Sequence, residues 1–192
     1  VHDLDCYAAG RWLLEHGLSQ CSGVGKGQPP APPPSGEKKT DPPKREKAPN
    51  APIRQNLVPA LVTDHPELTR RGLSAETCVY LGCGAYGEAH KGPLAGRIVF
   101  QIRGLDEKNG ALRPVILTHM GRALTDTQAQ DGGKWHAYGG FHKTLEIYNL
   151  DHLLLDSQAI TQAQACGHVL LVEGCFDVAA LIEAGIRNVG AT

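Results

Sequence analysis

The sequence predicts an α+β region followed by part of an α/β unit, with a disordered proline-rich linker ahead of both. Three observations lead to this prediction. Nine of the 13 prolines fall within residues 22–52, and two β-rich stretches meet at Asn109-Gly110, a pair typical of tight hairpins. The apolar run at 169–172 precedes a stretch with helical spacing and then a second apolar run, as in a β-α-β unit. A chain of 192 residues holds one or two domains.

The charges and the cysteines limit the class of protein. The net charge of −1 divides unevenly, because residues 22–52 carry six basic and three acidic side chains and the remainder sums to −4. A uniformly basic surface for nucleic acid is excluded, and any site for a polyanion must be a local patch. The six cysteines form no CxxC pair, and the chain shows neither a signal peptide nor an apolar run of membrane-spanning length. We expect a soluble cytoplasmic protein with reduced thiols and no membrane contact.

The first 55 residues are expected to have no core of their own. Residues 1–21 contain one short helix over 3–16, which Gly17 would end. The proline, lysine and glycine tracts of residues 22–55 bury too little apolar surface to offset the entropy of ordering, so we expect a disordered linker there. Segment 1–21 also holds four possible zinc ligands whose spacing matches no established zinc pattern: His2, Cys6, His16 and Cys21.

Two short helices open the α+β region. Asp64 or Thr63 is expected to cap the first helix, which begins at Pro66. Ser74 is expected to cap the second helix, whose sequence is AETCVYLG. Gly72 lies between them and ends the first helix, so the two helices are separate elements.

A β-rich section follows the helices. RIVFQIR alternates as a half-buried strand does, and ALRPVILTHM supplies its hairpin partner. Pro114 within the partner strand argues for an edge or a bulge at that point. Residues 125–133 are expected to form a polar loop, and residues 134–150 to form short extended pieces and turns. Together these elements make up an α+β region over residues 56–156.

The section over residues 157–192 changes character. A helix is expected over 157–166, a strand buried on both faces over 169–172, a helix over 176–184 and a second buried strand over 186–190. A β-α-β unit needs a right-handed crossover and further strands to cover its sheet. We therefore expect the chain to be part of a longer protein.

Two carboxylates follow the first strand of this unit. Glu173 stands directly after the strand and before a glycine that opens a helix, at the edge of α/β sheets where ligands bind. Asp177 lies in the first turn of the same helix. Each is a candidate catalytic residue, although acidic residues also occur at helix N-termini because the helix dipole favours them there.

A glycine-rich segment at residues 82–87 imitates a dinucleotide-binding motif. It reads GCGAYG and fits GxGxxG, and Asp106 lies about 20 residues downstream. The segment follows an amphipathic helix instead of a buried strand, and KGPLAG breaks any helix after it. We therefore predict a turn that leads into the sheet, and no dinucleotide cofactor.

The C-terminal stretch VLLVEGCFDVAALIEAGIRNVGAT resembles the first half of a Toprim domain, the fold shared by bacterial primases, type IA and type II topoisomerases and certain nucleases. HPELTRRGLSAETCVYLGCGAYG resembles the segment that opens the RNA-polymerase domain of bacterial DnaG-type primases. GRIVFQIR, MGRAL, GKWHAY and FHKTLEIYNL then follow in that family's order. The resemblance covers residues 60–192 and implies a primase-type subdomain over 56–156 and a partial Toprim domain over 157–192.

The resemblance implies a function and a set of site residues. A DNA primase makes short RNA primers on single-stranded DNA from nucleoside triphosphates, with the replicative helicase as its partner. Its Toprim carboxylate assists Mg²⁺- or Mn²⁺-dependent attack of the primer 3′-hydroxyl. That role and the metal fall on Glu173, with Asp177 as a second catalytic candidate. The basic residues expected to bind nucleotide or template are Arg122, Lys134, Lys143, Arg97 and Arg103.

The chain departs from the family pattern in two places. A Toprim domain takes most of its metal-binding capacity from a later DxD pair, and none follows Glu173 here. Because a hard divalent cation needs several oxygen ligands, we expect the chain alone to be inactive. The family also has an N-terminal zinc ribbon. Residues 1–21 resemble only the helix that closes it, so zinc is expected only with the missing part of that module.

Two other functions stay open from the sequence. Another Toprim protein, a nuclease or a topoisomerase-like enzyme, would use Glu173 in phosphodiester cleavage, but neither class needs the RGL, GRAL and FxK series. A non-catalytic remnant would use the basic residues alone, to bind single-stranded DNA.

Overall fold

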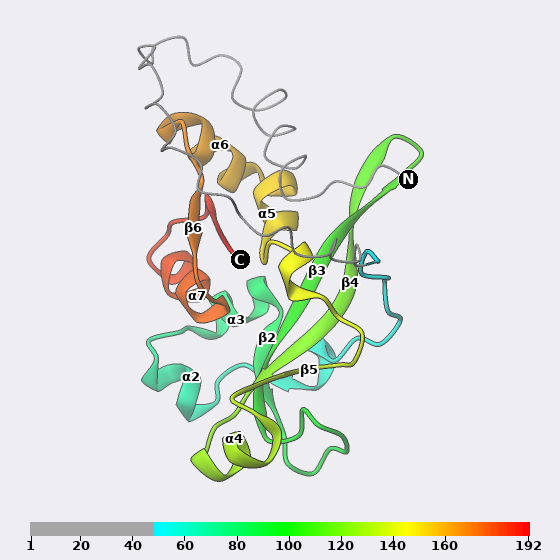
Figure 1. Cartoon of the computed structure of the whole chain (residues 1–192). Coiled ribbons are helices and arrows are strands. Elements are labelled where there is room, and N and C mark those ends of the chain that lie inside the picture. The colour runs from blue at the N-terminus through cyan, green and yellow to red at the C-terminus, as the bar shows by residue number, and fades with distance from the viewer. Residues whose placement is uncertain (1–47) are drawn as a thin grey trace, which may run out of the picture.

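The computed structural model describes residues 48–192, so the expectations for residues 1–21 and for most of the linker lie outside the described residues. The described part has the α+β fold that the sequence predicts (Figure 1). Its main sheet has five antiparallel strands in chain order, and two parallel strands form a separate sheet. The strands are β1 (Leu61–Val62), β2 (Cys83–Tyr86), β3 (Arg97–Lys108), β4 (Ala111–Arg122), β5 (Trp135–Ala137), β6 (Leu170–Val172) and β7 (Val189–Ala191).

The described part also contains helices and two short 3-10 turns. They are α2 (Pro66–Arg70), α3 (Ala75–Leu81), α4 (Asp126–Gly132), α5 (Leu150–Leu155), α6 (Ser157–Cys166), α7 (Cys175–Glu183) and the turns η1 (Val58–Ala60) and η2 (Lys143–Leu145). The helices α3 and α6 match their predictions. The sequence does not predict the short helix α5.

The caps of the first two helices differ in how well the sequence predicts them. Ser74 caps α3, since its hydroxyl accepts a hydrogen bond from the N–H of Thr77 at 3.2 Å. The prediction of Asp64 or Thr63 as the cap of α2 is wrong. His65 is the cap, and its Nδ1 accepts a hydrogen bond from a main-chain N–H of the first turn at 3.2 Å. The reason is that a proline at the first helical position makes the residue directly before it the cap.

The β3–β4 hairpin is the longest element of the main sheet. Asn109 (φ 57°) and Gly110 (φ 75°) adopt left-handed conformations at its tip, as a type I′ turn requires. The first six residues of β3 are all buried, so this strand does not alternate as the sequence suggests. β4 pairs with β5 only over Met120–Arg122, which leaves Pro114 on a strand edge within the described part, as predicted.

The segment predicted as a polar loop at 125–133 folds as the helix α4. Thr125 accepts a hydrogen bond from the N–H of Gln128 at 3.1 Å, and the side chain of Gln128 accepts one from the N–H of Leu124 at 2.9 Å. These reciprocal bonds resemble a capping box, and the sequence carries its Thr-x-x-Gln spacing. The loop prediction is wrong because the capping spacing outweighs the polar composition.

Residues 48–55 contain no helix or strand, but they are bound to the folded body. The N–H of Ile53 donates to the carbonyl of Ile116 at 2.7 Å. The side chain of Asn50 donates to the carboxylate of Glu146 at 2.8 Å. Asn50 and Ile53, which the sequence places in the linker, are therefore bonded to the folded part.

The C-terminal section is a β-α-β unit, in which β6 and β7 lie parallel and α7 joins them. The prediction that β6 is buried on both faces is wrong, because Leu171 is 59% exposed. Within residues 48–192, β6 pairs with β7 alone, so it lacks the neighbours that would bury it. The assignment of this unit to a Toprim domain stays a prediction.

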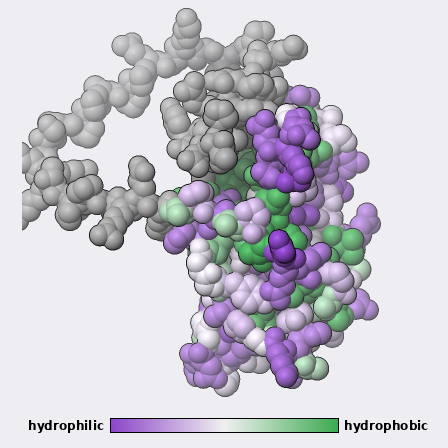
Figure 2. Space-filling model, turned by 90° about the vertical axis from the view of Figure 1, so that its right-hand side faces the viewer, coloured by the Kyte–Doolittle hydropathy of each residue, from purple (hydrophilic) through white to green (hydrophobic). Residues whose placement is uncertain are grey.

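Hydrophobic residues cover both faces of the main sheet near β2 and β3. The larger core joins one face to residues of α3 and α7, and a smaller cluster contains Leu57, Leu94 and Val99 on the other. Hydrophilic residues predominate on the side of the molecule shown in Figure 2, with hydrophobic ones between them. Among residues 48–192, every helix is too short or too polar to span a membrane.

Candidate functional site

Three strands of the main sheet place a row of side chains on the face that packs against α7. Ile98, Arg122 and Trp135 are paired across β3, β4 and β5, so their side chains share this face. Trp135 packs on Phe176 of α7, with ring centroids 6.0 Å apart. The end of the main sheet is thereby joined to the first turn of α7.

The two predicted catalytic carboxylates lie on either side of the N-cap of α7. Gly174 is the N-cap, and Glu173 precedes it as an exposed side chain. Asp177 is also exposed, and its Oδ2 lies 3.5 Å from the position that a Cβ on Gly174 would take. Both residues therefore lie near the positive end of the helix dipole.

Two guanidinium groups cover the aromatic pair. Cζ of Arg71 lies 4.2 Å from the ring centre of Phe176, and Cζ of Arg122 lies 5.6 Å from that of Trp135. Burial lowers the pKa of Arg122, and the nearby charge of Arg71 lowers it further. Arg71 is paired with Glu67 at 2.9 Å, whereas Arg122 has no ion-pair partner within residues 48–192. A half-buried cation without an ion-pair partner is suited to bind an anion.

Of the two predicted lysines, Lys143 lies near the first turn of α7. Lys134 is exposed and directly precedes Trp135. Lys143 is exposed and lies near Cys175 of α7. Burial raises the pKa of the Cys175 thiol to about 12, and the charge of Lys143 acts in the opposite direction. Arg122 and Lys143 thus lie beside the aromatic pair and the first turn of α7, and the place of Lys134 in the site stays a prediction.

The other two predicted cations point into the protein. Arg97 is 3% exposed, and its guanidinium donates to three main-chain carbonyl groups. Nε of Arg103 lies 2.8 Å from the carboxylate of Asp151, and its Nη2 contacts the ring of His152 at 3.1 Å. Arg97 is buried and Arg103 is half-buried, and both guanidinium groups have partners within the protein, so template contact by either residue stays a prediction.

Sequence reasoning missed Arg71, Trp135 and Phe176 as site residues. Arg71 belongs to the RGL segment, Trp135 follows Lys134, and Phe176 lies inside the VEGCFD stretch. Basic residues interleaved with aromatic ones are typical of surfaces that bind nucleic acid, because cations hold phosphates and rings stack on bases. That interleaving is the signal that could have identified them.

The described residues do not by themselves fit a metal ion. No group of three or more His, Cys, Asp or Glu side chains that could hold one occurs among residues 48–192. Glu173 and Asp177 both lie at the N-terminal end of α7, but a hard divalent cation needs more oxygen ligands than two carboxylates offer. The expected Mg²⁺ or Mn²⁺ stays a prediction.

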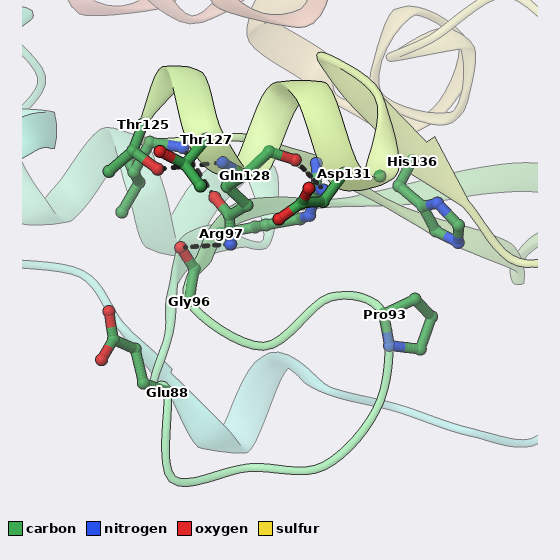
Figure 3. A pocket seen from close by; sticks show the side chains of 11 residues that line it. Glu88, Pro93, Gly96, Arg97, Thr125, Thr127, Gln128, Asp131 and His136 are labelled. Atoms are coloured by element: carbon green, nitrogen blue, oxygen red, sulfur yellow. Dashed lines mark hydrogen bonds between the residues drawn. The ribbon is translucent and has the colours of Figure 1, made fainter.

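A pocket of about 440 Å³ lies between α4 and the loop before β3 (Figure 3). Arg97 and His136 are among its lining residues. His136 follows Trp135 on β5, and successive side chains of a strand point to opposite faces. The pocket is therefore separated by the sheet from the site at α7.

No protein-family profile matches the chain, and no curated protein matches it in sequence. Solved structures do match it. One is the Aquifex aeolicus primase with its zinc-binding and RNA polymerase domains, at 20% identity and a TM-score of 0.46, over 67% of this chain and 37% of that one. Another is the RNA polymerase domain of Mycobacterium tuberculosis DnaG bound to DNA with an overhang, at 18% identity and a TM-score of 0.45, over 75% and 56%.

A DnaG primase catalytic domain bound to single-stranded DNA also matches, at 22% identity and a TM-score of 0.43, over 68% of this chain and 46% of that one. The chain thus spans between 37% and 56% of the length of these three structures. These three structures are catalytic or RNA polymerase domains of primases, the family that the sequence motifs of this chain also resemble.

Proposed function

We propose that this chain is part of the catalytic core of a DnaG-type primase and binds single-stranded DNA and nucleoside triphosphates during the synthesis of RNA primers. The observation that supports this most is the meeting of Arg122, Trp135 and Phe176 at the first turn of α7. Glu173 and Asp177 belong to the same end of that helix. Basic and aromatic groups from the sheet therefore meet the helix that carries the carboxylates.

The cations of this site are assigned to phosphates. Phosphoryl transfer depends chiefly on positioning the reacting groups and on neutralising the charge of the transferred phosphate. Arg122 and Lys143 supply positive charge beside α7. Arg122 is half-buried, and an ionic contact is stronger there than in bulk water. We assign both residues to phosphates of the nucleotide or the template.

The aromatic pair is assigned to bases. Trp135 and Phe176 are both half-buried, and each has a guanidinium over its ring. Arginine stacks on aromatic rings, and bases stack on aromatic side chains with little preference for sequence. A single strand that passes this site would therefore find stacking partners next to phosphate partners.

Within residues 48–192, no third ligand accompanies Glu173 and Asp177 to hold a metal ion. We expect this chain to bind DNA. We expect no primer synthesis by the chain alone when the four ribonucleoside triphosphates and Mg²⁺ or Mn²⁺ are added. Cleavage of the oligonucleotide under the same conditions would instead favour a nuclease.

Fluorescence anisotropy with a labelled oligothymidylate tests the proposal. Arg122→Ala should weaken binding roughly tenfold and lower the slope of log K against log salt by about 0.7, the value for one phosphate contact on a single strand. The matched control is Arg113→Ala, an exposed arginine paired with Asp106 in the outer part of the β3–β4 hairpin. Glu173→Gln should leave binding unchanged. Absence of salt-dependent binding, or an equal loss in both arginine variants, would contradict the proposal.

A further inference from the structure

Arg97 lies on the face of the main sheet opposite α7, under α4 (Figure 3). Its Nη1 donates to the carbonyl of Gly133 at 2.9 Å and, more weakly, to that of Gly121 at 3.5 Å. Its Nη2 donates to the carbonyl of Gln128 at 3.2 Å. One buried side chain thus bonds three separate points of the main chain.

These three points belong to the loop that begins at Arg122 of the proposed site and ends before Lys134. Gly121 directly precedes Arg122, and Gly133 directly precedes Lys134. Gln128 belongs to α4 between them. The N–H of Ala123 donates a hydrogen bond to the carbonyl of Lys134 at 3.0 Å and closes the same loop. The guanidinium of Arg97 therefore holds both ends of the loop and its helix together.

The neighbouring glycines leave room for this arginine. A Cβ on Gly132 would lie 2.8 Å from Nη2 of Arg97, and a Cβ on Gly121 would lie 2.9 Å from its Cδ. Real Cβ atoms essentially never come closer than 3.0 Å to another heavy atom of this kind, so an alanine at either position would force the Arg97 side chain to move. The glycines of the MGRAL and DGGK stretches thus fit the shape of the Arg97 side chain.

Arg97 is suited to this position by the shape of its guanidinium more than by its charge. Burial lowers the pKa of Arg97, and within residues 48–192 no carboxylate lies within ion-pair distance of it. Its Nε is buried without a hydrogen-bond partner in the described part. A planar fork with five donors reaches carbonyl groups in several directions, whereas the ammonium of lysine is a single point. A buried cation without a countercharge is costly, so charge alone does not explain an arginine at this position.

We propose that Arg97 is a positioning residue, which fixes the main chain at Arg122 and Lys134 from the opposite face of the sheet. It thereby holds Arg122, the basic residue of the α7 site on this loop, in place without contacting DNA itself. This inference rests on the proposed function, because the importance of these residues comes from it. It replaces the template contact that the sequence suggests for Arg97.

Binding of labelled oligothymidylate tests the proposal in the whole chain, at a temperature well below the melting point of each variant. Arg97→Lys and Arg97→Gln should each weaken binding roughly fivefold, since neither side chain can bond all three carbonyl groups. Gly132→Ala keeps the arginine but displaces its Nη2, and should weaken binding about twofold. The control Arg113→Gln should leave the affinity unchanged. In an Arg122→Ala background, Arg97→Gln should lower the affinity for oligothymidylate little further, because Arg97 acts through Arg122.

The fluorescence of Trp135 gives a second readout that does not depend on DNA. The chain has two tryptophans, so a Trp12→Phe background makes Trp135 the single emitter. Arg97→Lys should change its emission maximum or its quenching by acrylamide, and Arg113→Gln should not. If oligothymidylate fails to bind even to the unaltered chain, the proposed function fails, and the fluorescence still decides the role of Arg97.

Three results would overturn the positioning role. The first is an affinity loss in the Arg97 variants that adds fully to the loss in Arg122→Ala, together with a salt slope lowered by the value of about one phosphate contact. That result would mean that Arg97 itself touches a phosphate. The second is a lower melting temperature with unchanged affinity and unchanged Trp135 emission, which would mean a purely structural role. The third is a normal affinity for Arg97→Lys, which would mean that charge alone suffices.

Discussion

The main sheet and the C-terminal β-α-β unit differ in how completely their strands are covered. In β3, Ile98, Val99 and Phe100 are each 0% exposed, whereas Leu171 in β6 is 59% exposed. β3 has a strand on each side and hydrophobic clusters on both faces, while β6 pairs only with β7 within residues 48–192. The candidate site lies where the two regions meet. Phe176 joins α7 to the main sheet through Phe100 and Trp135, and α7 also packs on α3 and on β7 of its own small sheet. The difference between β3 and β6 shows that an apolar strand is buried only where it has neighbouring strands and covered faces.

The largest effect is expected where the two regions pack on each other, at Phe100. Its ring lies 4.9 Å from that of Phe176, and 6.1 Å from both Tyr148 and Trp135. Phe100→Ala should lower the free energy of unfolding by about 3–5 kcal/mol, because it removes a fully buried ring and leaves a cavity. Urea denaturation measures this loss. A loss below about 1 kcal/mol would mean that the regions do not depend on this contact.

A smaller effect, confined to the main sheet, is expected on acidification. His119 is fully buried in β4, its Nε2 accepts a hydrogen bond from the N–H of Leu57 at 3.3 Å, and burial lowers its pKa from 6.5 to about 4. The unfolded chain therefore takes up this proton at a higher pH than the folded chain, so stability falls as pH falls. The slope should approach about 1.4 kcal/mol per unit between pH 6.5 and pH 4.

Denaturation midpoints across this pH range measure that slope. His119→Gln should flatten it, because the residue that binds the proton is gone. His168→Gln is the control, since His168 is an exposed histidine outside the main sheet. An unchanged slope in the His119 variant would assign the acid sensitivity to another group.

The next effect concerns the hydrogen bonds that tie α3 to α7. The hydroxyl of Ser74 caps α3 and donates to the carboxylate of Glu183 at 2.8 Å, and the N–H of Ser74 donates to the same oxygen at 2.9 Å. Ser74→Ala should lower the free energy of unfolding by about 0.5–2 kcal/mol, the usual cost of losing such a cap. Ser74→Thr should recover most of it because threonine also caps. Equal losses in both variants would exclude the hydroxyl as the cause.

The elements with local signals could be predicted from the sequence. Asn109-Gly110 identifies the hairpin and Ser74 identifies α3, because both signals depend on residues next to each other in the chain. The exposure of Leu171 could not be predicted, since it depends on how many strands flank β6. An apolar run indicates a strand, but the number of its neighbours is a property of the tertiary structure.

For the candidate site, the sequence identified residues but not the direction in which their side chains point. The order of the motifs led to Arg122 and Lys143, which lie beside the first turn of α7, and to Lys134, whose role stays a prediction. The same order could not tell that Arg97 points to the opposite face. That direction is set by strand register, which pairs Ile98 with Arg122 and leaves the preceding residue on the other side.

The smallest effect is expected at Leu171, the most exposed strand residue of this comparison. Leu171→Ser should change the free energy of unfolding by less than about 0.5 kcal/mol, because most of the side chain is already in contact with water. Urea denaturation at two protein concentrations measures it beside Phe100→Ala. A loss of about 2 kcal/mol or more, as for a core leucine, would mean that another surface covers β6 in solution. If that loss also grew with protein concentration, the covering surface would be a second copy of the chain, and the contrast between the two regions would vanish on association.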